Sequence, residues 1–233
     1  MSGRVYRARR IVALVVLVAV VFVSLLTSED MWQPLLVQKP SPIQTATGST
    51  VDLLATIDVK GRAPKTGYER TQFGNGWAVM DGCDTRNIIL YRDLKNPVVS
   101  EGCKVASGIL NDPYTGNMVA FVRGPSTSDD VQIDHVVALS NAWQTGAQQL
   151  SQEERERLAN DPLELLAVDG SANQEKSDGD AATWLPQNKA FRCQYVARQV
   201  AVKAKYRLWV TPAEKEAIVR ILSTCPGQPL PTE

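Results

Sequence analysis

The sequence predicts an α+β fold for residues 51–233, in which short strands and helices surround one core. Apolar runs typical of strands alternate with a capped helix between residues 131 and 176. Two helical patterns then follow one another between residues 188 and 225. Of the 233 residues, 44% are hydrophobic and 21% are charged, a composition that supports a buried core and excludes a disordered chain.

The N-terminal residues predict an export signal. Residues 1–10 form a basic segment, expected on the cytoplasmic side, and precede the apolar run IVALVVLVAVVFVSLL. Residues 11–28 are predicted to be either a signal anchor or a signal peptide, and the anchor is favoured because no A-x-A cleavage site follows. A retained anchor would make the membrane a partner. Residues 29–50 are rich in Pro, Ser and Thr and predict a linker, so the folded domain is expected to start near Val51.

Two segments in the first part of the domain have patterns of regular structure. The run VDLLATIDV at 51–59 predicts a short amphipathic helix. The run RNIILYRDL at 86–94 follows a glycine-rich turn region and predicts a strand.

The C-terminal part predicts a helical hairpin. Apolar residues recur at helical spacing between residues 188 and 207, and Thr211 with Glu214 forms a capping box for a second helix. A short connection makes the two helices antiparallel, which brings Cys193 close to Cys225. Cys83 and Cys103 are then expected to pair across a local loop. An even number of cysteines after an export signal favours disulfides over a metal site.

The single histidine of the chain, His135, follows Asp134 in the apolar run VQIDHVVALS. In a regular strand over 131–139 the two side chains would lie on opposite faces, giving a buried neutral histidine and a solvated aspartate. A working site instead requires the strand to end or bend at this pair. These two structures remain alternatives for the pair taken alone.

The elements that follow favour a site. A helix capped by Ser151 and Glu154 ends at Asn160, an apolar strand spans 163–168, and a glycine-containing turn leads to the N-x-x-K sequence at 173–176. Asn160 is equally compatible with a simple helix stop.

In this order of residues the chain resembles the HNH (ββα-metal) nuclease superfamily. Asp134 with His135, Asn160, and Asn173 with Lys176 match its three elements. The runs GCDTRN, DPYTG, IDHVVALS, NQEKSDGDAATWLP and VKAKYRLWVT extend the resemblance to exported HNH proteins related to the C-terminal domain of GmrSD-type restriction enzymes. Many HNH proteins have proline three residues after the histidine, where this chain has Ala138.

The resemblance implies a ββα-metal core that hydrolyses phosphodiester bonds with one divalent ion, Mg²⁺ or Mn²⁺. His135 would be the general base, because an imidazole with an ordinary pKa of about 6.5 suits that task, and activity would rise with pH through about 6 to 7. The oxygens of Asp134 and Asn173 would hold the metal. By resemblance, Asn160 steadies the loop that orients the histidine. Lys176 would contact the phosphate or neutralise transition-state charge. These assignments require Asp134, His135 and Asn173 to converge.

Charge indicates where nucleic acid would bind. Lys and Arg (25) balance Asp and Glu (25), so a polyanionic partner needs a local basic patch. Residues 186–210 contain six basic and no acidic side chains, among them Arg192, Lys203 and Lys205, and are interleaved with aromatic residues. Nucleic acid, with DNA favoured over RNA, is therefore the expected substrate, and no protein partner is inferred. A catalytically silent envelope or binding protein and a hydrolase of another phosphodiester are the alternatives.

Overall fold

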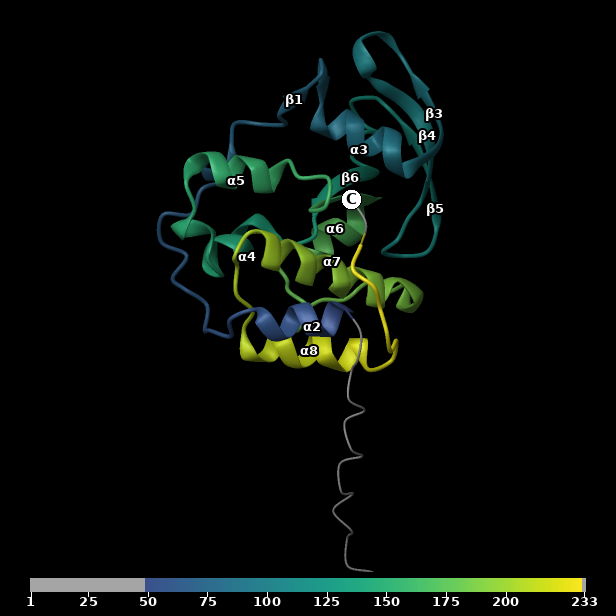
Figure 1. The fold of residues 1–233 in the computed structure, drawn as a ribbon. Coiled ribbons are helices and arrows are strands. Elements are labelled where there is room, and N and C mark those ends of the chain that lie inside the picture. The colour runs from purple at the N-terminus through teal and green to yellow at the C-terminus, as the bar shows by residue number, and fades with distance from the viewer. Residues whose placement is uncertain (1–48, 232–233) are drawn as a thin grey trace, which may run out of the picture. The chain divides into compact units, whose positions relative to one another are not determined.

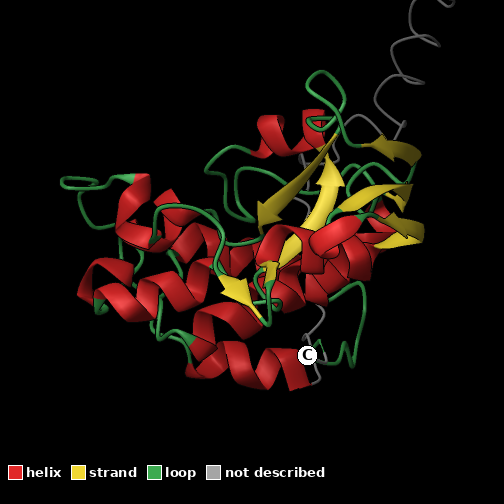
Figure 2. Ribbon diagram, turned by 90° about the horizontal axis from the view of Figure 1, so that it is seen from above, coloured by secondary structure: helices red, strands yellow, loops and turns green. Residues whose placement is uncertain are grey.

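The computed structural model describes residues 49–231, so the predicted export segment at 11–28 and nearly all of the predicted linker lie outside the described residues. The described part is a mixed α+β domain with small antiparallel sheets and two disulfides (Figures 1 and 2). Its α-helices are α2 (Ser49–Thr56), α3 (Thr85–Asp93), α4 (Leu139–Gln144), α5 (Gln152–Ala159), α6 (Gly170–Lys176), α7 (Arg192–Lys205) and α8 (Pro212–Leu222). Its strands are β1 (Val79–Met80), β2 (Cys83–Asp84), β3 (Leu94–Val99), β4 (Val105–Asn111), β5 (Met118–Val122), β6 (Val131–His135) and β7 (Leu165–Asp169). Within residues 49–231, no helix has the length and apolar character to cross a membrane.

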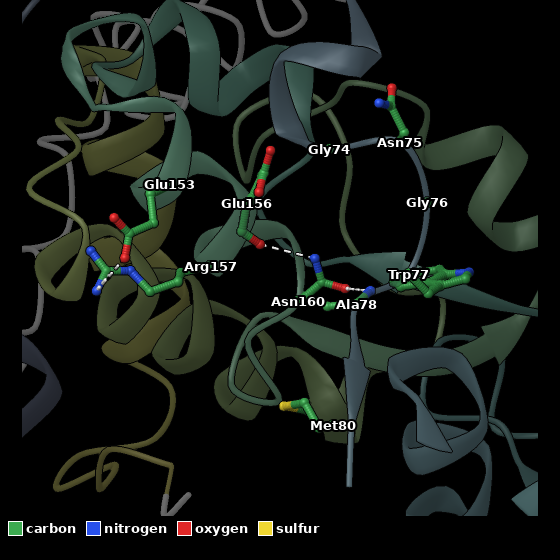
Figure 3. Close-up of a pocket in the computed structure, with 10 residues that line it drawn as sticks. All are labelled: Gly74, Asn75, Gly76, Trp77, Ala78, Met80, Glu153, Glu156, Arg157 and Asn160. Carbon is green, nitrogen blue, oxygen red and sulfur yellow. Dashed lines mark hydrogen bonds and ion pairs between the residues drawn. The ribbon is translucent and has the colours of Figure 1, made fainter. Parts of the chain in front are cut away.

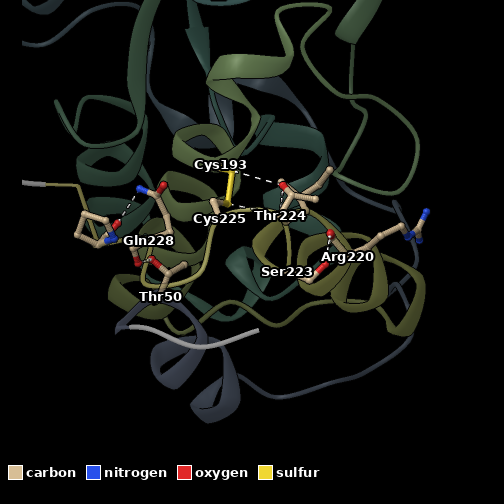
Figure 4. Close-up of a disulfide and its surroundings, with 9 residues drawn as sticks. Thr50, Cys193, Arg220, Ser223, Thr224, Cys225 and Gln228 are labelled. Carbon is tan, nitrogen blue, oxygen red and sulfur yellow. Dashed lines mark hydrogen bonds between the residues drawn. A yellow bond between two sulfur atoms is a disulfide. The ribbon is translucent and has the colours of Figure 1, made fainter. Parts of the chain in front are cut away.

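The predicted helical hairpin is confirmed. The helix α8 begins with the Thr211 and Glu214 capping box and a proline in its first turn. The helix α2 packs against both α7 and α8, and in Figure 1 α2 and α8 lie beneath α7. The Cys193–Cys225 disulfide joins the start of α7 to the segment after α8, with the two Cα atoms 6.5 Å apart (Figure 4). The second predicted disulfide, Cys83–Cys103, also forms.

The prediction of a strand at 86–94 was wrong, because most of this segment is the helix α3. The Asp84 carboxylate accepts a hydrogen bond from the backbone N–H of Asn87 and caps the helix. The apolar run then buries one side only, since Ile89 and Leu90 are fully buried and Tyr91 is 61% exposed. Helix α3 leads into β3, which pairs with β4, and β4 pairs in turn with β5 to complete a three-stranded antiparallel sheet.

The strands β6 and β7 form an antiparallel pair, with Val131 opposite Asp169 and His135 opposite Leu165. The helix α6 begins directly after β7 and packs against both strands, which gives the strand, strand, helix order that the resemblance implied. Strand β6 ends at His135. Two residues later, the backbone N–H of Val137 donates to the buried Glu164 carboxylate at 3.1–3.2 Å. The strand therefore ends at the Asp134 and His135 pair, as a working site requires.

Candidate active site

His135 lies at the end of β6 and is only 7% exposed, and through that fraction it lines a cavity of about 680 Å³. Its Nε2 is 3.0 Å from the backbone carbonyl oxygen of Ala159. A carbonyl can only accept, so Nε2 carries the proton and Nδ1 is the basic nitrogen of the ring. The indole of Trp77 stacks on the imidazole, with centroids 5.7 Å apart and planes 5° from parallel. These two contacts fix both the tautomer and the orientation of the ring.

Burial lowers the pKa of His135 from 6.5 to about 3. The positive charges of Arg70 and Lys176 act in the same direction, and the hydrogen bond to Ala159 opposes them. The imidazole is therefore neutral, and able to accept a proton, throughout the neutral pH range. The rise of activity through pH 6 to 7 that the sequence predicted does not follow from titration of this ring.

Asp134 is buried beneath the same cavity, and both of its carboxylate oxygens have partners. Oδ1 accepts a hydrogen bond from Lys176 Nζ at 2.9 Å, and Oδ2 accepts one from the Tyr114 hydroxyl. Burial raises the pKa of this carboxyl, while the positive charge of Lys176 and the hydrogen bond from Tyr114 lower it. The ammonium group therefore favours the ionised carboxylate in a site that would otherwise favour its protonation.

Lys176 lies behind the pair rather than in the cavity. It is 2% exposed, and its ammonium also donates to the backbone carbonyl oxygen of His135 at 2.9 Å. The residues that line the cavity do not include it. This position does not support the expected contact with a phosphate, because the charge of the ammonium is directed to Asp134. It supports a positioning role instead.

Asn173 in α6 lines the same cavity as Asp134 and His135. Its amide nitrogen donates to Gln132 Oε1 at 2.9 Å, while its amide oxygen accepts no hydrogen bond from residues 49–231. An ionised carboxylate and an amide oxygen in a polar cavity fit Mg²⁺ or Mn²⁺, which keep several water ligands and need few from the protein. Nowhere in residues 49–231 do three or more His, Cys, Asp or Glu side chains form a cluster of the kind that closes a structural zinc site.

Asn160 connects the end of α5 to the segment that carries Trp77. Its amide nitrogen donates to the backbone oxygen of Glu156, and its Oδ1 accepts from the backbone N–H of Ala78 at 2.8 Å (Figure 3). These residues line a second hollow of about 480 Å³, which also includes Trp77. The end of α5 thus holds the histidine from two directions, through the Ala159 carbonyl and through the segment before Ala78.

The structure does not place the predicted basic residues of α7 on one open surface. Lys203 is fully buried and pairs with the buried Glu214 carboxylate at 2.6 Å, so its assignment to nucleic-acid binding was wrong. Lys205 pairs with Asp161 at 2.8 Å. The Arg192 guanidinium donates to a backbone carbonyl six residues earlier in the chain. Each of the three side chains therefore already has a partner within the protein, and Lys203 is the one among them that is buried.

Sequence reasoning missed cationic and aromatic side chains that line the cavity. Lys65, Arg70 and Trp77 belong to the segment before α3, and no spacing relates them to the residues of β6 and α6. The sequence DTRN at 84–87 allows Arg86 either to lie near a phosphate or to pair with Asp84 or Asp93. The structure places Arg86 at the cavity, where its guanidinium donates to two backbone carbonyls.

Comparison with known proteins agrees with the resemblance read from the sequence. Residues 86–221 match the family model of the C-terminal domain of GmrSD restriction endonucleases, a range that contains β6, α5, β7 and α6. An "Uncharacterized secreted protein" of Arthroderma benhamiae is 36% identical over 189 residues, which cover 80% of this chain and 90% of that protein. No solved structure matches. The chain therefore belongs to the family of GmrSD restriction endonuclease C-terminal domains.

Proposed function

We propose that the protein is a metal-dependent endonuclease that hydrolyses phosphodiester bonds of nucleic acid outside the cytoplasm. The observation that carries this proposal is that Asp134, His135 and Asn173 all line one cavity. A catalytically silent fold would not require β6 to end at Asp134 and His135, nor α6 to bring Asn173 to the same cavity. The match to a family of restriction endonucleases supports nuclease chemistry, and it makes DNA the favoured substrate of this proposal.

His135 is the proposed general base. Its Nδ1 would accept a proton from the attacking water, because Nε2 is committed to the Ala159 carbonyl. Trp77 keeps the ring in place during this transfer. Burial keeps the ring neutral, so it is ready to accept the proton at neutral pH.

Asp134 and Asn173 would hold Mg²⁺ or Mn²⁺ through oxygen atoms. When bound, the cation would stabilise the negative charge that develops on the phosphate oxygens. Lys176 would keep the Asp134 carboxylate ionised and oriented. Asn160 would hold the loop that carries the Ala159 carbonyl and the segment before Ala78.

Two disulfides and a relative named as secreted support export of the domain. Residues 11–28 would supply the signal anchor or signal peptide.

The test is cleavage of supercoiled plasmid and of RNA by the full chain with Mg²⁺, Mn²⁺ or EDTA. We expect metal-dependent cleavage that His135→Ala reduces by about 10²–10⁴-fold, the usual loss for a general base. Asp134→Ala should weaken metal affinity, so that extra metal partly restores activity. Asp52→Ala, an exposed carboxylate on α2, is the matched control and should leave activity unchanged.

Cleavage by His135→Ala at the wild-type rate would overturn the assignment of the base. No cleavage with either metal would favour the catalytically silent alternative. In that case the two Asp134 oxygens would serve only their partners within the protein, Lys176 and Tyr114. Cleavage of a small phosphodiester but of neither nucleic acid would favour the remaining alternative.

A further inference from the structure

The cavity around His135 has more positive charge than its own carboxylates neutralise. Five charged side chains line it: Lys65, Arg70, Arg86, Asp134 and Asp178. The Asp134 carboxylate already pairs with the buried ammonium group of Lys176, which does not line the cavity. Asp178 pairs with Lys65 at 3.6 Å. Two arginines therefore face the cavity without a carboxylate partner inside it.

Arg86 is held in place without being neutralised. Its guanidinium donates to the backbone carbonyl oxygens of Ser128 at 3.2 Å and Val131 at 3.1 Å, and it forms no ion pair with a carboxylate of residues 49–231. Burial and the nearby charge of Arg123 lower the pKa of Arg86, whereas Asp129 and Asp84 raise it. A half-buried cation in these surroundings is stabilised when an anion binds beside it.

Arg70 also lines the cavity and belongs to a different element, the short 3-10 helix Arg70–Phe73. It is exposed and makes no ion pair within residues 49–231. It is nevertheless close enough to His135 for its charge to act on the imidazole. Its guanidinium is therefore available to a ligand that also reaches the general base.

We propose that Arg70 and Arg86 bind backbone phosphates of a polynucleotide next to the phosphodiester that is presented to His135. This inference rests on the proposed function and adds to it two residues that would bind phosphates on either side of the one that is cleaved. It also moves the nucleic-acid interface from α7 to the cavity, since the basic side chains of α7 that were predicted to bind nucleic acid have protein partners.

The test measures binding of a fluorescently labelled DNA duplex to the full chain by anisotropy, in EDTA and at several salt concentrations. Each phosphate contact contributes about 0.9 to the slope of log affinity against log salt for duplex DNA. We expect Arg70→Ala to weaken binding and to reduce this slope by about that amount, which corresponds to about a 3.5-fold smaller loss of affinity between 50 and 200 mM salt. Arg70→Lys should retain the slope, because the charge remains.

Two further variants keep the outcome decisive. Arg86→Gln should lower the slope similarly, and its thermal melting reports whether the lost backbone contacts unfold the domain. Arg220→Ala, an exposed arginine of α8, is the control and should leave the slope unchanged. An unchanged slope for Arg70→Ala, an equal reduction for Arg220→Ala, or no binding by the wild type would overturn the proposal.

Failure of this inference is distinguishable from failure of the proposed function. If the wild type binds DNA through Arg70 but cleaves nothing with metal, the phosphate site stands and the nuclease assignment fails. If the wild type cleaves DNA and Arg70→Ala has the wild-type affinity and KM, the nuclease assignment stands and the phosphate site fails.

Discussion

The buried neutral state of His135 predicts a specific dependence of stability on pH. The unfolded imidazole binds a proton with an ordinary pKa of about 6.5, whereas the folded one has a pKa of about 3. As the pH falls below the unfolded value, only the unfolded state takes up the proton, so stability is lost between about pH 6.5 and pH 3. At about 1.4 kcal/mol per pKa unit, the full window is worth about 5 kcal/mol, and at pH 5 the loss is about 2 kcal/mol.

A variant isolates this contribution from other titrating groups. The raised pKa values of the buried carboxyls Asp134 and Glu164 favour the folded state as the pH falls and oppose the histidine. His135→Gln cannot titrate, and its amide nitrogen, which corresponds in position to Nε2 of the imidazole, retains a donor for the Ala159 carbonyl. Urea unfolding of both proteins in EDTA should show that wild type loses about 2 kcal/mol relative to the variant between pH 8 and pH 5. Parallel stability curves would refute the reasoning, because they would mean that the folded imidazole titrates like an unfolded one.

Three other predictions concern the framework of the site. Lys203→Met should lower the free energy of unfolding by about 3–5 kcal/mol, because it leaves a buried carboxylate unpaired, and should leave the salt dependence of DNA binding unchanged. An altered salt dependence would contradict its structural role. Trp77→Leu should lower kcat with little change in KM and mix the tautomers of His135 in a ¹⁵N NMR spectrum at pH 8, where the single imidazole gives one set of signals. Trp77→Phe should preserve both, and an unchanged tautomer in Trp77→Leu would argue against the role of the stack. Replacing Cys193 and Cys225 by serine should cost about 2–4 kcal/mol in urea unfolding, and an equal stability would show that the helical hairpin needs no crosslink.

The sequence by itself determined the features that depend on local chemistry. The capping boxes at Ser151 and Thr211 begin helices because a side-chain oxygen satisfies backbone N–H groups only a few residues away. The pairing of Cys193 with Cys225 followed from two adjacent antiparallel helices. The order of elements around Asp134 and His135 also followed, because strand and helix patterns differ in period.

Only the tertiary structure decided which charged side chains face solvent, the core or the cavity. Lys203 was expected to bind nucleic acid and Lys176 to act on the phosphate, yet each is buried against a carboxylate that a different element supplies. The strand-like apolar run at 86–94 likewise forms most of the helix α3, because its N-terminal cap and its single buried face suit a helix. Arg70 lines the same cavity as His135 although the two are 65 positions apart in sequence, and no local pattern predicts that they share it. Burial and long-range charge depend on which elements pack together, so they are properties of the fold rather than of any short segment.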